Sequence, residues 1–220
     1  DRYYDYIDDL ENSKFIISVD NDDKKMNTLE AKNYMASKTN LNSYYSDNSS
    51  KIMAINADIP TTEWDILVLI SDDMIPEIKG FDSIIRERMN KHYPDTDGVL
   101  WFYDGWRKDL NTLCILGRKY YDRFGYIYHP SYESFWSDAE FTEVADNLEK
   151  QTFIDQVIIR HLHPDIVMAD KDTRVKFANF LPEYASVGSY GHDELWQKNS
   201  LEGDPDHKIY LKRKEKGFNL

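Results

Sequence analysis

Apolar and polar residues alternate in blocks along the chain, and each block predicts one element of secondary structure. Short apolar runs bounded by polar residues are typical of buried strands. Apolar residues that recur three and four positions apart are typical of amphipathic helices. On these patterns we expect strands at residues 14–19, 65–71, 98–103, 112–116 and 156–163, and helices at residues 3–10, 28–37, 81–89 and 137–148.

The order of these elements predicts the fold class. Strands and helices alternate through the first half of the chain, which favours an α/β fold with a mostly parallel sheet flanked by helices. Residues 38–50 are polar and predict a loop, and residues 51–56 predict a short strand or a strand–helix junction. With 220 residues and no repeat or linker, the chain is expected to form one domain, residues 1–220.

The chain is acidic, which restricts its partners. It has 27 Lys and Arg against 40 Asp and Glu, a formal net charge of −13. This charge argues against nucleic acid or an anionic bilayer as the main partner, and a phosphate-bearing ligand then requires a metal ion or a local cluster of cations. The basic run at residues 212–216 is predicted to be a solvated tail. A single cysteine, Cys114, excludes an internal disulfide and a cysteine-based zinc site.

The same sequence predicts a cytoplasmic protein. No run approaches the ~20 apolar residues that a membrane-spanning helix needs. The chain also opens without the charged and apolar segments of a signal peptide.

Two adjacent carboxylates, Asp72 and Asp73, follow the most apolar run of the chain. Ligands of open α/β sheets bind outside the carboxyl ends of the strands, and carboxylates are hard ligands suited to Mg²⁺ or Mn²⁺. The alternative interpretation is that two aspartates before Pro76 form a turn at the end of the strand.

Two histidines add to this prediction. His161 and His163 lie two positions apart on a predicted strand and therefore share a face, and Pro164 ends the strand. In a parallel sheet this places both histidines at the same edge as Asp73, where oxygen and nitrogen ligands together favour Mn²⁺. Taken singly, each histidine is also explained as a hydrogen-bonded polar residue.

Further carboxylates follow the first predicted strand and lie in the first turn of the last predicted helix. Asp20, Asp22 and Asp23 either bind a ribose or base at a strand end or form a polar turn. Ser137 and Glu140 match the capping-box pattern, which explains Glu140 as a helix-start residue. Asp138, beyond the aromatic segment 126–136, is either a first-turn carboxylate or a general base for a hydroxyl.

Taken together, these segments resemble the GT-A class of nucleotide-sugar glycosyltransferases, in particular the large inverting family-2-like group. The matching segments lie at residues 18–23, 51–56, 64–76, 98–102, 135–141 and 161–164. Residues 71–74 resemble the Asp-X-Asp metal motif of this class, and residues 136–141 resemble its acidic motif on the acceptor side. About residues 1–75 would then form the nucleotide-binding half, and about 76–220 the acceptor side and the C-terminal segment.

The resemblance implies a role for each candidate residue. Asp73 would bind the Mn²⁺ or Mg²⁺ that bridges the donor diphosphate, and Asp138 would deprotonate the acceptor hydroxyl. Residues expected at the nucleotide sugar or the metal are Asp20, Asp22, Lys51, Asp72, His161 and His163. The expected partners are a nucleotide diphosphate sugar and a carbohydrate or other hydroxyl acceptor.

The chain departs from the class at two points. Ser71 stands where the motif has its first aspartate, and the chain starts at the first helix of the class without the strand that usually precedes it. Two other functions are compatible with the same residues. One is a metal-dependent phosphohydrolase or nucleotidyltransferase, and the other is a non-catalytic domain that binds glycans on its aromatic segment.

Overall fold

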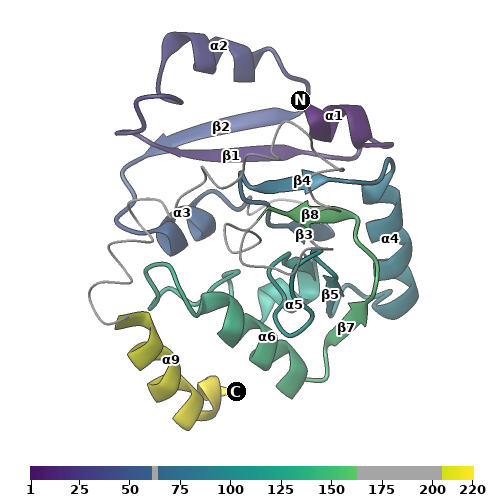
Figure 1. The fold of residues 1–220 in the computed structure, drawn as a ribbon, viewed down its shortest axis with the longest axis vertical. Helices are drawn as coiled ribbons and strands as arrows, with labels where there is room; N and C mark the ends of the chain where they lie inside the picture. The colour runs from purple at the N-terminus through teal and green to yellow at the C-terminus, as the bar shows by residue number, and fades with distance from the viewer. Residues whose placement is uncertain (61–63, 163–204) are drawn as a thin grey trace, which may run out of the picture.

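The computed structural model describes residues 1–60, 64–162 and 205–220. These residues form a mixed α/β fold, shown in Figure 1. The strands are β1 Phe15–Asp20, β2 Leu41–Ser46, β3 Ile66–Val68, β4 Met74–Pro76, β5 Val99–Phe102, β6 Ile115–Gly117, β7 Gln151–Ile154 and β8 Ile159–His161. The helices are α1 Arg2–Tyr6, α2 Leu29–Ala36, α3 Lys51–Ala57, α4 Phe81–His92, α5 Arg118–Asp122, α6 Ser137–Asn147 and α9 Pro205–Glu215, followed by the 3₁₀ turn η4 Gly217–Asn219.

The strands form sheets of mixed orientation, so the expected mostly parallel sheet is not confirmed. Among the described residues, β1 pairs with β2 and β5 with β7 in parallel, whereas β3–β6, β5–β6 and β4–β8 are antiparallel. The strands lie in three sheets, β1–β2, β3–β6–β5–β7 and β4–β8. The reason is clearest between β5 and β6, where residues 103–114 return without a helix. A parallel pair needs a longer crossover connection, usually a helix.

Two local predictions are wrong for physical reasons. Residues 38–50, expected as a loop, contain β2, whose polar residues pair with β1 through backbone hydrogen bonds that do not depend on side-chain polarity. Residues 51–56, expected as a strand or a junction, form α3. The hydroxyl of Ser50 accepts a hydrogen bond from the Met53 N–H at 3.1 Å and so caps this helix.

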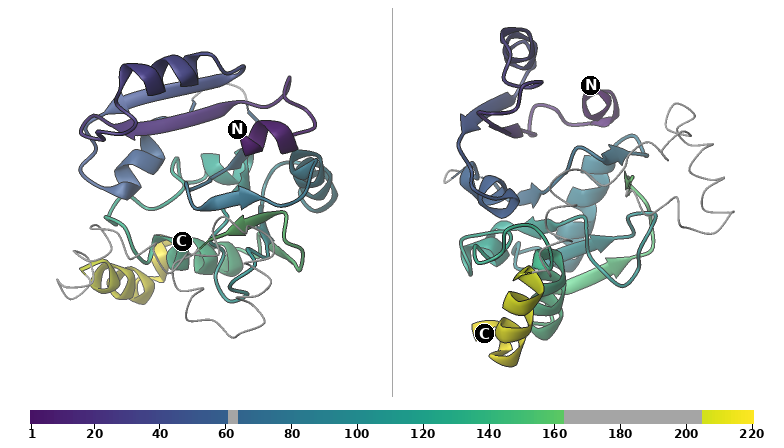
Figure 2. Two further views of the ribbon diagram at one scale, coloured as in Figure 1. Left: turned by 45° about the horizontal axis from the view of Figure 1, so that its top comes forward. Right: turned by 60° about the vertical axis from the view of Figure 1, so that its left-hand side comes forward.

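The core lies on both faces of the four-stranded sheet. Leu100 and Phe102 of β5 pack with the apolar face of α4, whereas Val99 packs on the opposite face with residues of α5 and α6. This alternation follows from the two-residue period of a strand. Figure 2 shows the resulting arrangement from two further sides. Among the described helices, none is both long and apolar enough to cross a membrane.

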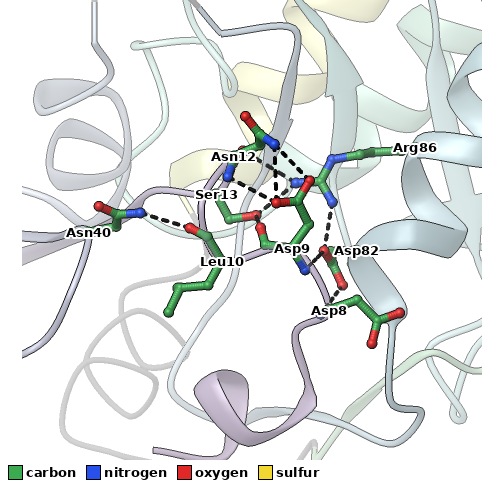
Figure 3. Close-up of polar contacts among 8 residues, drawn as sticks. All are labelled: Asp8, Asp9, Leu10, Asn12, Ser13, Asn40, Asp82 and Arg86. Carbon is green, nitrogen blue, oxygen red and sulfur yellow. Dashed lines mark hydrogen bonds and ion pairs between the residues drawn. The ribbon is translucent and has the colours of Figure 1, made fainter.

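Polar contacts attach the N-terminal segment to α4, as Figure 3 shows. The buried carboxylate of Asp82 accepts hydrogen bonds from the backbone N–H groups of Asp8 and Asp9, at 2.9 and 3.0 Å, and from Arg86 at 2.6 Å. Burial opposes ionisation, but these hydrogen bonds outweigh it and lower the pKa of Asp82. The contacts hold α1 beside β4, where the Tyr3 hydroxyl donates to the Met74 carbonyl at 2.9 Å.

Candidate functional site

The site begins at the turn that joins β3 to β4. The Met74 N–H donates to the Ser71 carbonyl at 3.1 Å, which closes a turn over residues 71–74. Within this turn, the Ser71 hydroxyl donates to the Asp73 carboxylate. The Asp72 side chain is exposed, whereas that of Asp73 is 35% exposed. Residues 71–74 therefore form the expected turn, and within it the Ser71 hydroxyl orients the Asp73 carboxylate.

The pairing of β4 with β8 brings His161 to Asp73. The register places Met74 opposite His161, so the start of β4 lies beside the end of β8. The His161 Nε2 is 3.1 Å from the Asp73 Oδ2, and the Leu162 N–H donates to the Asp73 carbonyl at 2.8 Å. The two residues meet as expected, but through an antiparallel pair rather than at the common edge of a parallel sheet. His163 lies outside the described residues.

A second carboxylate, Asp104, lies on the other side of His161. Its Oδ2 is 3.7 Å from the His161 Nδ1, and its backbone carbonyl accepts the His161 N–H at 2.9 Å. Asp104 is 1% exposed and accepts further hydrogen bonds from the backbone of Trp106 and Arg107 and from the Thr112 hydroxyl, at 2.7 to 2.8 Å. The sequence indicates only a turn at this residue. Its place two residues after the end of the buried strand β5 is the signal that could have identified it.

The electrostatics of this group make His161 a cation at neutral pH. Burial alone would lower the pKa of His161, but hydrogen bonding to Asp104 and Asp73 and the charges of both carboxylates raise it to about 9. Burial would likewise raise the pKa of Asp73, yet the contacts with His161 and Ser71 outweigh it and lower this pKa. The pKa of Asp104 is lowered for similar reasons. The site thus holds a charged histidine between two ionised carboxylates.

The charge of Lys51 acts on both Asp73 and Asp138. Lys51 is the first residue of α3, and its charge lowers the pKa of both Asp73 and Asp138. Burial dominates at Asp138 and raises its pKa, while the Ala139 N–H at 2.9 Å and the charges of Lys51 and Arg107 oppose this rise. Lys51 therefore lies within electrostatic range of two carboxylates from distant parts of the chain. One of these carboxylates is kept ionised, and the other is more basic than an ordinary aspartate.

The start of α6 differs from the predicted capping box. The helix starts after Trp136, whose φ of 63° is in the left-handed region, and no side chain caps it. The Glu140 carboxylate instead accepts from the Tyr132 hydroxyl at 2.7 Å and pairs with Arg213. The capping-box prediction is wrong because these partners, eight residues before Glu140 and 73 residues after it, engage its carboxylate. Asp138 lies in the first turn of α6, as expected.

The carboxylates after β1 form a separate group. Asp20 is exposed and accepts from the Asn48 side chain at 2.9 Å. Asp23 accepts from the backbone N–H groups of Lys25 and Met26, which matches its turn interpretation. Asp22 is exposed. In the part of the chain that the structure describes, no hydrogen bond or ion pair joins Asp20 or Asp22 to Asp73 or His161.

The described part of the site offers few ligands for a divalent cation. Among residues 1–60, 64–162 and 205–220, no group of three or more His, Cys, Asp or Glu side chains could hold a metal ion. Asp73 offers one carboxylate, whereas the cationic His161 pairs with Asp73 and Asp104 through its two ring nitrogens and in this form has no lone pair for a metal. Mg²⁺ is usually held by one or two carboxylates together with water and substrate phosphates. The residues present therefore suit a cation that arrives with a phosphate ligand.

Comparisons of the chain with protein-family models, with curated proteins and with solved structures find no match. The functional interpretation therefore rests on the geometry and charge of the site.

Proposed function

We propose that the protein is a metal-dependent glycosyltransferase that transfers a sugar from a nucleotide diphosphate sugar to a hydroxyl acceptor with inversion. The observation that carries this proposal is the joint placement of the Asp73–His161–Asp104 group with Lys51 and Asp138. It combines an ionised carboxylate for a cation, positive side chains for a diphosphate and a basic carboxylate for a proton.

The diphosphate side of the site is formed by Asp73, Lys51 and His161. Asp73 would hold Mn²⁺ or Mg²⁺ together with the diphosphate, and His161 adjoins the same position. When bound, the cation would offset the negative charge that develops on the leaving diphosphate. Lys51 and the His161 cation add positive charge on the protein side. Asp20 and Asp22, exposed at the end of β1, are available for the ribose or base, and Asp72 is available beside the turn.

The acceptor side is formed by Asp138. Its raised pKa, a consequence of burial, makes its carboxylate a better proton acceptor at neutral pH than an ordinary aspartate. In the proposed reaction, the acceptor oxygen forms a bond to the anomeric carbon while the bond from this carbon to the diphosphate oxygen breaks. The acceptor proton passes to Asp138, and the electron pair of the broken bond leaves with the diphosphate.

Metal-dependent nucleotide binding tests the donor side. Calorimetry with UDP and GDP should detect binding that requires Mn²⁺ in the wild-type protein, and Asp73→Asn should abolish it. Asp65→Asn is the matched control, because Asp65 is an exposed carboxylate just before β3. Binding that is undiminished in Asp73→Asn would remove the metal assignment.

Sugar transfer tests the acceptor side and separates the other functions. Asp138→Asn should retain nucleotide binding and lose transfer, and normal turnover in this variant would leave Asp138 as a helix-start residue only. Release of phosphate or pyrophosphate without a sugar acceptor would instead indicate a phosphohydrolase or nucleotidyltransferase. A metal ion that binds the folded state raises the melting temperature, so both enzyme functions predict a shift with Mn²⁺. Glycan binding without such a shift would indicate a non-catalytic domain.

A further inference from the structure

The helix α9 presents one face to the segment that precedes Asp138. Figure 1 shows α9 beside α6, with which it is in contact. Side chains spaced three and four residues apart form one face of a helix. On α9 these are Asp206, His207, Tyr210, Arg213 and Lys214, and all of them contact residues between 133 and 143.

Asp206 fixes the backbone just before α6. Its carboxylate is 3% exposed and accepts three consecutive backbone N–H groups, from Glu133 at 3.0 Å and from Ser134 and Phe135 at 2.8 Å. Hydrogen bonds to an ionised acceptor are stronger than neutral ones. On its other side, the Glu133 carbonyl accepts the Ile52 N–H of α3 at 3.3 Å. Asp206 therefore holds the short stretch that lies between the starts of α3 and α6.

His207 supports the residue at which the chain enters α6. Trp136 has a φ of 63°, which is uncommon for a large side chain and persists only where the surroundings fix it. The His207 ring stacks on the Trp136 ring, with centroids 4.2 Å apart and planes 20° apart. Asp138 follows two residues later, so its direction depends on this left-handed residue.

Arg213 holds the first turns of α6 from the same side. Its guanidinium forms two hydrogen bonds with the Glu140 carboxylate, at 2.6 and 2.8 Å, and the two side chains are only 12% and 6% exposed. Lys214 and the Tyr210 hydroxyl bond to Glu143, one turn further along. The two-point geometry of an arginine with a carboxylate restricts orientation as well as distance. The basic run at the C-terminus is thus not simply a solvated tail, because two of its members bind α6.

We propose that Asp206 and Arg213 are positioning residues that set the place and direction of Asp138 through the segment 133–140. The catalytic part of this proposal rests on the proposed function, because it takes Asp138 as the base in sugar transfer. The attachment of α9 to the start of α6 is a property of the fold. In the proposed reaction, the residues of α9 neither form nor break a bond to the substrates.

The test compares Asp206→Asn with wild-type protein in the full chain. The variant loses the charge that three N–H groups share, so the turnover number for transfer should fall about 10- to 100-fold, the loss expected when a reacting group moves by about 1 Å. The KM for the nucleotide sugar should change less than the turnover number, because Asp206 reaches the donor side only indirectly, through the hydrogen bond from the Ile52 N–H to the Glu133 carbonyl. Lys212→Gln, on the exposed side of α9, is the control and should match wild type.

Two measurements separate positioning from folding and from the proposed function. Amide exchange at residues 133–135 should become faster in Asp206→Asn, and exchange in α4 should not change. Carboxyl NMR should show that the pKa of Asp138 falls as its site hydrates, because burial raises this pKa and the Ala139 N–H, Lys51 and Arg107 oppose the rise, while the neutral Tyr128 and Cys114 face the carboxylate. His207→Ala, which removes the ring that stacks on Trp136 and leaves the Asp206 carboxylate in place, should show a smaller change of the same kind and serves if Asp206→Asn does not fold.

The outcomes distinguish the two proposals. A folded Asp206→Asn with unchanged turnover and an unchanged pKa of Asp138 would overturn the positioning role and leave α9 as a structural helix. If wild-type protein transfers no sugar, the proposed function fails. In that case the exchange and titration measurements still decide whether α9 sets Asp138.

Discussion

Asp97 provides the sharpest test of the electrostatic reasoning, because its carboxylate joins three separate parts of the fold. It lies before β5, is 6% exposed, and pairs with Arg123 at 2.7 Å and with Lys150 at 3.0 Å. Hydrogen bonding to Arg123 is the largest influence, and together with Lys150 it outweighs burial and lowers the pKa of Asp97 to about 2. The substitution Asp97→Asn removes the charge and keeps the shape.

The magnitude follows from the linkage between protonation and folding. A fall of the pKa from 3.8 to about 2 corresponds to about 2.4 kcal/mol of stability at neutral pH. Arg123 and Lys150 are about one-third exposed, so solvent screening reduces this figure to about 1–2 kcal/mol. Because the pKa is lower in the folded state, the contribution is present above about pH 4 and is lost as the pH falls toward 2.

Urea unfolding of both proteins at pH 7 and near pH 2.5 measures this contribution. Asp97→Asn should be less stable than wild type by about 1–2 kcal/mol at pH 7, and the difference should shrink by at least half near pH 2.5. Asp122→Asn is the control, because its pair with Arg118 is exposed and such pairs contribute little. A wild-type advantage that is equal at both pH values would refute the assignment of the lowered pKa to this ion pair.

Two further substitutions test the site and the N-terminal attachment. Asp104→Asn should lower the pKa of His161 from about 9 toward its ordinary value of 6.5, because one of two neighbouring charges is lost, and NMR titration of the imidazole measures this shift. An unchanged titration would mean that Asp73 alone sets the charge of His161. Asp82→Ala should reduce the free energy of unfolding by about 2–3 kcal/mol, because two backbone N–H groups and Arg86 lose a charged partner. Unfolding in urea decides this, with Asp5→Ala on the exposed side of α1 as control.

The parts of the fold that depend on short-range patterns were predictable. β3 and β5 lie within expected apolar runs, β1 extends one residue past its expected run, and α4 and α6 start where amphipathic helices were expected. A buried strand or helix leaves its period in the sequence because one side of it contacts the core. Asp73 and Asp138 could be proposed as site residues for the same reason, since each lies next to an element whose pattern is clear.

The parts that depend on distant partners were not predictable. Glu140 carries a local helix-start pattern, yet its carboxylate binds Arg213, which is 73 residues away. Asp104 reads as a turn residue, and only the arrival of β8 places it beside His161. β2 is held by its backbone hydrogen bonds to β1, and none of its side chains is buried. Its sequence can therefore be polar and carries no apolar pattern of a strand. In each case the deciding contact has no counterpart in the neighbouring sequence.

The orientation of the strands accounts for the site more fully than the predicted sheet did. In a parallel sheet, Asp73 and His161 would both need to follow the ends of their strands, and strand order alone would set the distance between them. In the antiparallel β4–β8 pair, Asp73 precedes β4 and His161 ends β8, so the pairing itself makes them neighbours. A slip of one residue would turn the His161 side chain to the other face and separate it from both carboxylates. The site therefore depends on the register of a three-residue pair. This register is fixed from outside by Tyr3 at Met74 and by the backbone bonds of His161 and Leu162 to Asp104 and Asp73.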